Sequence, residues 1–337
     1  MTTTYDSLLK DLKARKFSPI YYLMGEEAYF IDSISDYIEK NVLSETEQDF
    51  NQTVVFGADT NMQNIIDMAK RYPMMSEYQV VIVKEAQALK NTDALEQYLS
   101  HMMPTTILVF CHKNGTLDKR KKLGGMLTKH KDAVLFVSNK LREDKLPQFV
   151  TSYLKTDGIS INEQAVQIIV TSIGSDLSRL VSEIDKLKIG LSDTNKRITP
   201  ETVEEIIGIN KDFNNYELVN AVTHKHIFKA NQIISYFEKN DKAGSLFSAI
   251  PYLFTFYSNL MQIHYSPRKD EHGIAEWLGI PSWMARNYIL PLRLFSPGKT
   301  LQIISKLREF DMRGKGVNNN TTSKEELLKE LLFFILH

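Results

Sequence analysis

The stretch that decides the fold of the first part of the chain is PIYYLMGEEAYFIDSISDYIEKNVL, residues 19–43. Its beginning, PIYYLMG (19–25), is a short apolar run that is typical of a buried strand. The remainder, from residue 27 to residue 43, places apolar side chains at the spacing of an amphipathic helix. A strand followed directly by such a helix indicates a parallel sheet with helices on both faces.

The same alternation of strand and helix continues to about residue 140. We expect further strands at 52–57, 79–83, 105–110 and 133–137, and helices at 61–71, 92–101 and 119–130. With the strand at 19–25 this makes five strands in all. The pattern therefore predicts an α/β domain over residues 1–140, with a mainly parallel five-stranded sheet.

After residue 140 the pattern becomes helical. Helices are predicted at 143–158, 162–174, 175–190 and 198–208, and then, with more aromatic residues, at 243–264, 297–312 and 324–337. The helix at 198–208 has clear end signals, since Thr199 can cap it, Pro200 suits its first position and Gly208 can close it. We predict two all-α domains here, over 141–212 and 213–337.

Composition limits the classes of function. The 337 residues are 43% hydrophobic and 24% charged, which is ordinary for a globular protein. Lys plus Arg and Asp plus Glu both number 41, whereas a protein that grips nucleic acid alone usually carries a positive excess. The single cysteine, Cys111, allows no internal disulfide, and no signal peptide or apolar stretch of about 18 residues occurs, so we expect a cytoplasmic protein without a membrane partner.

A nucleotide site is expected after the first strand of such a domain, and the residues there do not suit one. Gly25 is correctly placed, but Glu26 and Glu27 stand where phosphates would lie, and no Gly-Lys-Ser/Thr follows. The third strand ends in Lys84 and Glu85, where a nucleotide hydrolase needs acids for magnesium and for water. We interpret these five residues as a degenerate nucleotide site, and expect no catalytic residue, cofactor or metal ion.

Large apolar side chains stand in an unusual place just before the third strand. Tyr72, Met74 and Met75 surround Pro73 at a junction between helix and strand, where side chains usually face water. For one methionine, burial in the core is the simpler explanation. Pro73 favours exposure, because it ends the preceding helix and prevents a regular turn. Exposed Met and aromatic side chains are typical of adaptable protein-binding surfaces, so residues 72–75 are a candidate binding element.

The segment 113–131 is rich in basic side chains, and Asp118 is its one acid. Its basic residues are Lys113, Lys119, Arg120, Lys121, Lys122, Lys129 and Lys131. Such a segment can be a solvated surface helix, or it can meet nucleic acid or an acidic protein. The first interpretation is favoured because surface helices are routinely rich in lysine.

In their order and spacing these pieces resemble the delta subunit of the bacterial DNA polymerase III clamp loader. The resemblance is carried by PIYYLMGEEAYFID (19–32), FN (50–51), AKRYPMMSEYQVVIV (69–83), GSDLSRLVSEIDKL (174–187), ITPETVEEII (198–207), FDMRGKG (310–316) and a terminal leucine-rich helix. It covers nearly the whole chain. No single motif among these pieces is as specific as a phosphate-binding loop, so the combination carries the assignment.

The resemblance implies an AAA+-like α/β domain without a functional nucleotide site, then a lid domain at 141–212 and a collar domain at 213–337. It implies a non-catalytic subunit of the DNA polymerase III holoenzyme that binds the ring-shaped sliding clamp, beta, and helps to open it for loading onto primed DNA during replication. The other implied partners are the gamma/tau and delta-prime subunits, in a hetero-pentamer, and primer–template DNA.

The resemblance also assigns roles to residues. By position, Tyr72, Pro73, Met74 and Met75 form the clamp-binding element, although many relatives carry Leu-Phe in place of the two methionines and a small residue in place of the proline. Collar domains of such loaders surround the primer–template junction, so Trp283, Arg286 and Lys315 are candidate DNA contacts. A buried position in the collar core is an equally good interpretation of the tryptophan.

Two functions from other classes stay open. One is a P-loop-like nucleotide hydrolase with an atypical site, which nucleotide-dependent stabilisation or turnover would favour. The other is a stand-alone helical DNA-binding protein. Tight, salt-sensitive DNA binding by the chain alone would favour that interpretation, and the zero net charge argues against it.

Overall fold

The computed structural model describes residues 4–337 apart from 92, 119, 193–195, 241–243 and 320. The chain forms two compact units, of which the first ends at Leu141 and the second begins at Arg142. The boundary between the units lies one residue beyond the predicted end of the α/β domain. A further division of the helical part at residue 212 stays a prediction.

A five-stranded sheet is the centre of the first unit. Its strands are β1 (Ile20–Gly25), β2 (Gln52–Phe56), β3 (Gln79–Lys84), β4 (Thr106–Lys113) and β5 (Ala133–Ser138). They lie in the order β2-β3-β4-β1-β5, and every neighbouring pair is parallel. The predicted α/β fold with a parallel five-stranded sheet is therefore confirmed.

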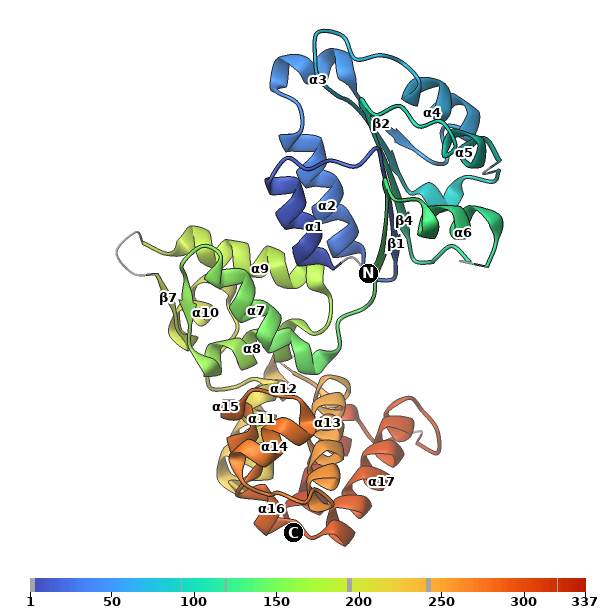
Figure 1. Ribbon diagram of the computed structural model, residues 1–337. Helices are drawn as coiled ribbons and strands as arrows, with labels where there is room; N and C mark the ends of the chain where they lie inside the picture. Colours follow the sequence, from blue (N-terminus) through green and yellow to red (C-terminus); the bar gives the residue numbers. More distant parts are fainter. Residues whose placement is uncertain (1–3, 92, 119, 193–195, 241–243, 320) are drawn as a thin grey trace. The chain divides into compact units, whose positions relative to one another are not determined.

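Helices cover both faces of this sheet, with α1 and α2 on one face and α4, α5 and α6 on the other (Figure 1). The helices are α1 (Tyr5–Lys13), α2 (Ala28–Asn41), α3 (Glu45–Asn51), α4 (Met62–Ala69), α5 (Asp93–Tyr98) and α6 (Lys122–Lys129). Alternate residues of β1 enter the two cores, since Tyr21 and Leu23 pack with α2, whereas Tyr22 and Met24 pack on the opposite face. This double burial explains the continuous apolar runs in the sequence.

The second unit consists mainly of helices, as predicted. They are α7 (Leu146–Lys155), α8 (Glu163–Ile173), α9 (Leu177–Gly190), α10 (Pro200–Ile207), α11 (Asn215–Thr223), α12 (Ile227–Lys239), α13 (Leu246–His264), α14 (Glu271–Leu278), α15 (Ser282–Ala285), α16 (Pro291–Leu294), α17 (Pro297–Gly314) and α18 (Lys324–Leu336). The end signals of α10 are confirmed, since the Thr199 side chain accepts a hydrogen bond from the backbone N–H of Thr202, Pro200 begins the helix and Gly208 has φ of 78°.

The expectation that strands end at residue 140 was wrong in one detail. Strands β6 (Ser160–Ile161) and β7 (Arg197–Ile198) pair in parallel within the second unit. Each strand is two residues long, which is too short to produce an alternation of apolar and polar residues in the sequence. No helix in the described part of the chain is long and apolar enough to cross a membrane.

Candidate functional site

The candidate binding element, Tyr72–Met75, lies in the connection between α4 and β3, at the amino end of the sheet (Figure 1). Its three large apolar side chains are exposed: the exposed fraction is 77% for Tyr72, 62% for Met74 and 104% for Met75, while Pro73 is half-buried. The expectation that this segment faces outward therefore agrees with the structure. Exposure alone does not test whether Tyr72–Met75 binds a partner, so its role as a binding site stays a proposal.

The helix before the element ends earlier than predicted. Helix α4 ends at Ala69, not at residue 71, so Pro73 is not the residue that ends it. Two polar side chains bind the last carbonyl groups instead, because Gln79 Nε2 donates to Met68 O (2.9 Å) and Thr106 Oγ1 donates to Ala69 O (2.8 Å). Both side chains stand at the starts of neighbouring strands, so the sheet fixes the point from which the element begins.

A buried asparagine holds the middle of the element. The backbone N–H of Met74 donates to Asn51 Oδ1 (2.6 Å), and Asn51 Nδ2 donates to Met74 O (2.9 Å). The exposed side chain of Met74 is thus carried on a backbone whose two polar groups are both hydrogen-bonded. The next residue, Met75, has φ of 52°, a left-handed conformation that residues other than glycine rarely adopt. The element is therefore a defined structure and not an irregular loop.

The helix that supplies Asn51 was missed in the sequence. Helix α3 (Glu45–Asn51) begins with a capping box, in which Glu47 Oε2 accepts from the backbone N–H of Ser44 (2.9 Å) and from its hydroxyl (2.7 Å). The pattern Ser-x-x-Glu at 44–47 is the usual signal of such a cap and could have predicted the start of the helix. These hydrogen bonds from Ser44 lower the pKa of the Glu47 carboxyl group.

The carboxyl end of the sheet carries the predicted degenerate nucleotide site. Gly25 has φ of 138°, and a Cβ atom there would lie 2.0 Å from Ser138 O. This glycine is required by close packing against β5. Glu26 is exposed, and the buried Glu27 caps α2 by accepting a hydrogen bond from Tyr29 N (3.2 Å). The chain's own carboxylate thus occupies the helix N-terminus that a phosphate group would need.

Lys84 and Glu85, at the end of β3, belong to a group of ion pairs that we call the carboxyl-end cluster. Lys84 Nζ lies 2.9 Å from Asp36 Oδ1 and 3.5 Å from Glu39 Oε2, both on α2. In the same cluster, Lys113 Nζ at the end of β4 lies 2.8 Å from Asp32 Oδ1 and 3.3 Å from Glu85 Oε1. The four acidic side chains of this cluster therefore bind lysines of the chain itself.

The ionisation of these lysines follows from the same contacts. Burial alone would lower the pKa of Lys84, but its hydrogen bond to Asp36 and the charges around it outweigh burial and raise that pKa. The pKa of Lys113 is raised in the same way, with burial opposed by Asp32 and Glu85. Both lysines therefore stay charged across the physiological range.

The sequence also singled out Cys111 and the basic segment 113–131. Cys111 is fully buried, and burial raises the pKa of its thiol to about 11, as fits a structural cysteine. In the basic segment, Arg120 pairs with Asp118 (3.1 Å) and Lys122 with Glu96 (2.8 Å), and Lys119 lies outside the described residues. Within the described ranges, no group of three or more His, Cys, Asp and Glu side chains could hold a metal ion.

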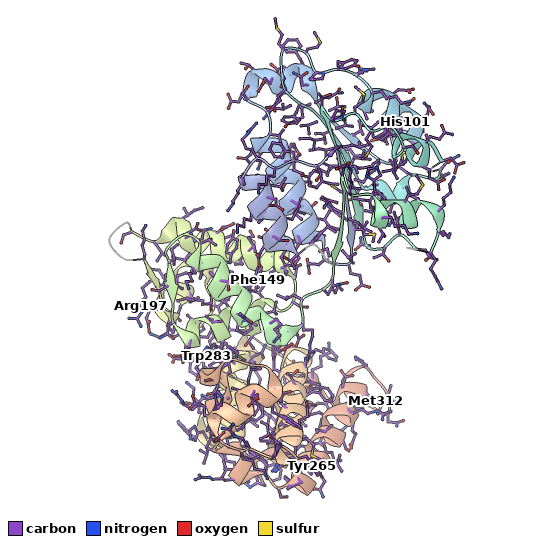
Figure 2. All side chains as sticks on the ribbon, in the orientation of Figure 1. His101, Phe149, Arg197, Tyr265, Trp283 and Met312 are labelled. Atoms are coloured by element: carbon purple, nitrogen blue, oxygen red, sulfur yellow. The ribbon has the colours of Figure 1, made fainter. Side chains whose placement is uncertain are left out.

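The candidate DNA contacts all lie in the second unit. Trp283 is half-buried and lines a polar hollow with residues of α8 and with Arg197 of β7, and both labelled side chains can be located in Figure 2. Arg286 is exposed and pairs with Glu271 (3.2 Å). Lys315 is exposed and pairs with Asp311 (2.7 Å). Their contact with DNA stays a prediction.

Comparisons with known proteins show similarity to DNA polymerase III delta subunits. Residues 21–164 match the family model described as DNA polymerase III, delta subunit. The chain is 26% identical over 339 residues to DNA polymerase III subunit delta of Bacillus subtilis (strain 168), covering 97% of this chain and 94% of that one. The solved structure of the Bacillus subtilis DNA clamp loader delta protein aligns over 99% of both chains, with a TM-score of 0.54 and 24% identity. The resemblance found in the sequence is thereby confirmed, and the structural match supports the same fold.

Proposed function

Because this chain is a relative of the DNA polymerase III delta subunits, we propose that it binds a ring-shaped sliding clamp through Tyr72–Met75 and helps to open that clamp for loading onto primed DNA. The observation that carries the proposal is the apolar element itself. It presents three exposed apolar side chains on a backbone that Asn51 holds in place. Adaptable exposed side chains on a defined backbone suit a docking surface.

The size of the element bounds what it can contribute to binding. Full burial of one such side chain stabilises by about 1.5–3 kcal/mol, so three provide roughly 5–9 kcal/mol before any opposing term. Micromolar affinity needs about 8 kcal/mol net, and association itself opposes binding through lost translational and rotational freedom. We therefore infer that further contacts near the element, including the exposed Arg71 and Glu77, add to the three anchors.

The decisive experiment measures binding of the chain to the sliding clamp of its own organism by surface plasmon resonance. A Met74→Asp/Met75→Asp double variant places two charges in the docking surface, so we expect affinity to fall by at least about 100-fold. The matched control is Ile189→Asp/Phe228→Asp, because these side chains are also highly exposed, at 84% and 77%, but lie in the second unit.

Each outcome of that experiment has a clear meaning. Loss of binding in the first double variant, with a retained unfolding temperature and an unaffected control, supports the proposal. Equal binding by all three proteins moves the contact away from Met74 and Met75. Failure of the native chain to bind any clamp contradicts the proposed function.

We propose that the chain itself does not hydrolyse ATP and that other subunits supply this activity. Support comes from Glu27, whose carboxylate caps α2 where a phosphate would sit, and from Lys84, which pairs with the acids of α2. Mg-ATP at millimolar concentration should leave the unfolding temperature of the pure chain unchanged. A nucleotide-dependent rise, which mass action requires of any ligand that binds the folded state, would favour a nucleotide hydrolase instead.

We propose that the helical part, residues 213–337, joins the chain to the other loader subunits. Support comes from an exposed groove that is lined by Tyr265, directly after α13, by Trp277 of α14 and by Ile304 of α17, of which Tyr265 is labelled in Figure 2. Tyr265 is 71% exposed and Trp277 is 50% exposed, as is typical of residues that become buried on assembly. Tyr265→Glu/Trp277→Glu should prevent co-purification with the other loader subunits without weakening clamp binding.

A further inference from the structure

Asn51 uses both side-chain N–H groups and its side-chain oxygen to bind two segments of the chain. One N–H of Nδ2 donates to Met74 O, the other donates to Glu47 O (3.1 Å), and Oδ1 accepts from Met74 N. The side chain is buried, with 3% of the residue exposed. The last turn of α3 and the element Tyr72–Met75 are therefore joined through one side chain.

The residue before Asn51 is a large exposed aromatic. Phe50 is 72% exposed although it lies in α3, directly beside a residue that is almost fully buried. A single exposed apolar side chain is common, and alone it would need no explanation. Phe50 differs because its neighbour in sequence fixes the backbone of Met74. Its aromatic ring thus belongs to the same end of the sheet as the three exposed side chains of the element.

We propose that Phe50 is a fourth apolar contact of the clamp-docking surface and that Asn51 is a positioning residue, which fixes Phe50 and Tyr72–Met75 as one surface before the clamp arrives. This inference rests on the proposed function, since it names further residues of the same docking surface. Burial of Phe50 against the clamp supplies part of the binding free energy that Tyr72, Met74 and Met75 alone do not provide. A surface that is already ordered loses less conformational freedom on binding, which increases affinity without any new contact.

Two variants separate the two roles. Phe50→Ser removes an exposed side chain and leaves Asn51 in place, so it should weaken clamp binding by about tenfold, as loss of an interface anchor does, with an unchanged unfolding temperature. Asn51→Ala releases Met74 from α3. It should weaken clamp binding and also expose the Met74 amide hydrogen to exchange with solvent, which a general loss of stability would not do selectively.

The chain offers a matched control for each variant. Asn41, at the end of α2, donates from Nδ2 to Tyr37 O (2.9 Å), which is the same bond to the fourth preceding residue that Asn51 makes to Glu47. Asn41→Ala therefore removes an equivalent local bond and should leave Met74 exchange and clamp binding unchanged. Phe228→Ser is the control for Phe50, since Phe228 is 77% exposed in the second unit.

The measurements are surface plasmon resonance against the clamp and amide hydrogen exchange of Met74 by NMR. Weakened binding by Phe50→Ser, together with faster Met74 exchange and weakened binding in Asn51→Ala, supports the inference. Native clamp affinity in both variants overturns it while the proposed function survives. No binding by the native chain overturns both. Weakened binding of Asn51→Ala with native Met74 exchange, or with exchange that is faster throughout the first unit, overturns the positioning role.

Discussion

The two ends of the five-stranded sheet have opposite surface chemistry. At the carboxyl ends of β3 and β4, Lys84 and Lys113 bind acids of α2 and Glu85, and Glu27 caps α2. At the amino end of β3, Tyr72–Met75 presents apolar side chains to solvent. The six residues of β3 separate these two ends by about 20 Å, at a rise of about 3.3 Å per residue.

This difference bears on where such a domain binds its ligands. Open α/β sheets usually bind ligands at the carboxyl ends of their strands. Here the residues of the carboxyl-end cluster are bound to one another, whereas the exposed side chains of Tyr72, Met74 and Met75 lie at the other end. The position of the candidate site therefore has to be argued from side chains, because the fold alone would indicate the opposite end of the sheet.

The largest effect should come from Gly25→Ala, which tests how tightly the carboxyl end is packed. The new Cβ would lie 2.0 Å from Ser138 O, and the backbone has φ of 138°, so the folded state must shift. We expect destabilisation by about 3–5 kcal/mol. Thermal unfolding measures it, with Gly298→Ala as the control, since beyond its chain neighbours and its own helix backbone no atom lies within 4 Å of the position of its Cβ. An unchanged unfolding temperature would contradict this close packing.

Lys84→Met tests whether the carboxyl-end cluster stabilises the domain. The lysine side chain is 16% exposed, and its removal leaves Asp36 and Glu39 without their cation. We expect a loss of about 1–2 kcal/mol, less than for a fully buried pair because the acids are partly in water. Urea unfolding measures the loss, and Lys121→Met, at an exposed position of the same unit, is the control. Equal stability of the two variants would show that the cluster contributes nothing.

Met75→Asn, at the amino end of the sheet, should increase the stability of the protein, whereas the two preceding substitutions should decrease it. Met75 is fully exposed and has φ of 52°, a conformation that asparagine tolerates better. We expect stability to rise by about 0.5–1 kcal/mol because local strain is relieved. If Met75 is a clamp anchor, the same variant should bind the clamp less tightly. Met74→Asn is the control. Met74 is not one of the described residues with a left-handed φ, so this substitution should relieve no strain and should bring no gain in stability.

The sequence predicted the fold well for physical reasons. Strands that are buried on both faces appear as continuous apolar runs, and α10 has a cap, a proline and a glycine at the correct places. Prediction from the sequence failed where an element is very short, or where residues distant in the sequence determine its end. Strands β6 and β7 have two residues each, and α4 ends where Gln79 and Thr106 bind its carbonyl groups. Contacts of that second kind follow from the fold and not from local sequence.

In the candidate site, too, some features can be predicted from the local sequence and others depend on contacts between distant residues. The apolar character of Tyr72, Met74 and Met75 can be read from the sequence, and so can the lack of a phosphate-binding loop after Gly25. The support beneath the element could not be predicted, because Asn51 and Met74 are 23 residues apart and meet only in the folded domain. The pairing of Lys84 with α2 was missed for the same reason.

The smallest effect concerns the Glu47 cap that begins α3 and thereby places Asn51. Hydrogen bonds from Ser44 lower the folded-state pKa of Glu47 below its ordinary value of 4.5, so its stabilising contribution is present above that value and is lost as pH falls through the lowered pKa. Native protein should therefore be more stable than Glu47→Gln near neutral pH, and the difference should shrink as the solution becomes acidic. Thermal unfolding against pH measures it, with Glu45→Gln, in the first turn of the same helix, as the control. If the difference in unfolding temperature between native protein and Glu47→Gln stays constant with pH, the charge of Glu47 does not contribute to the stability of α3.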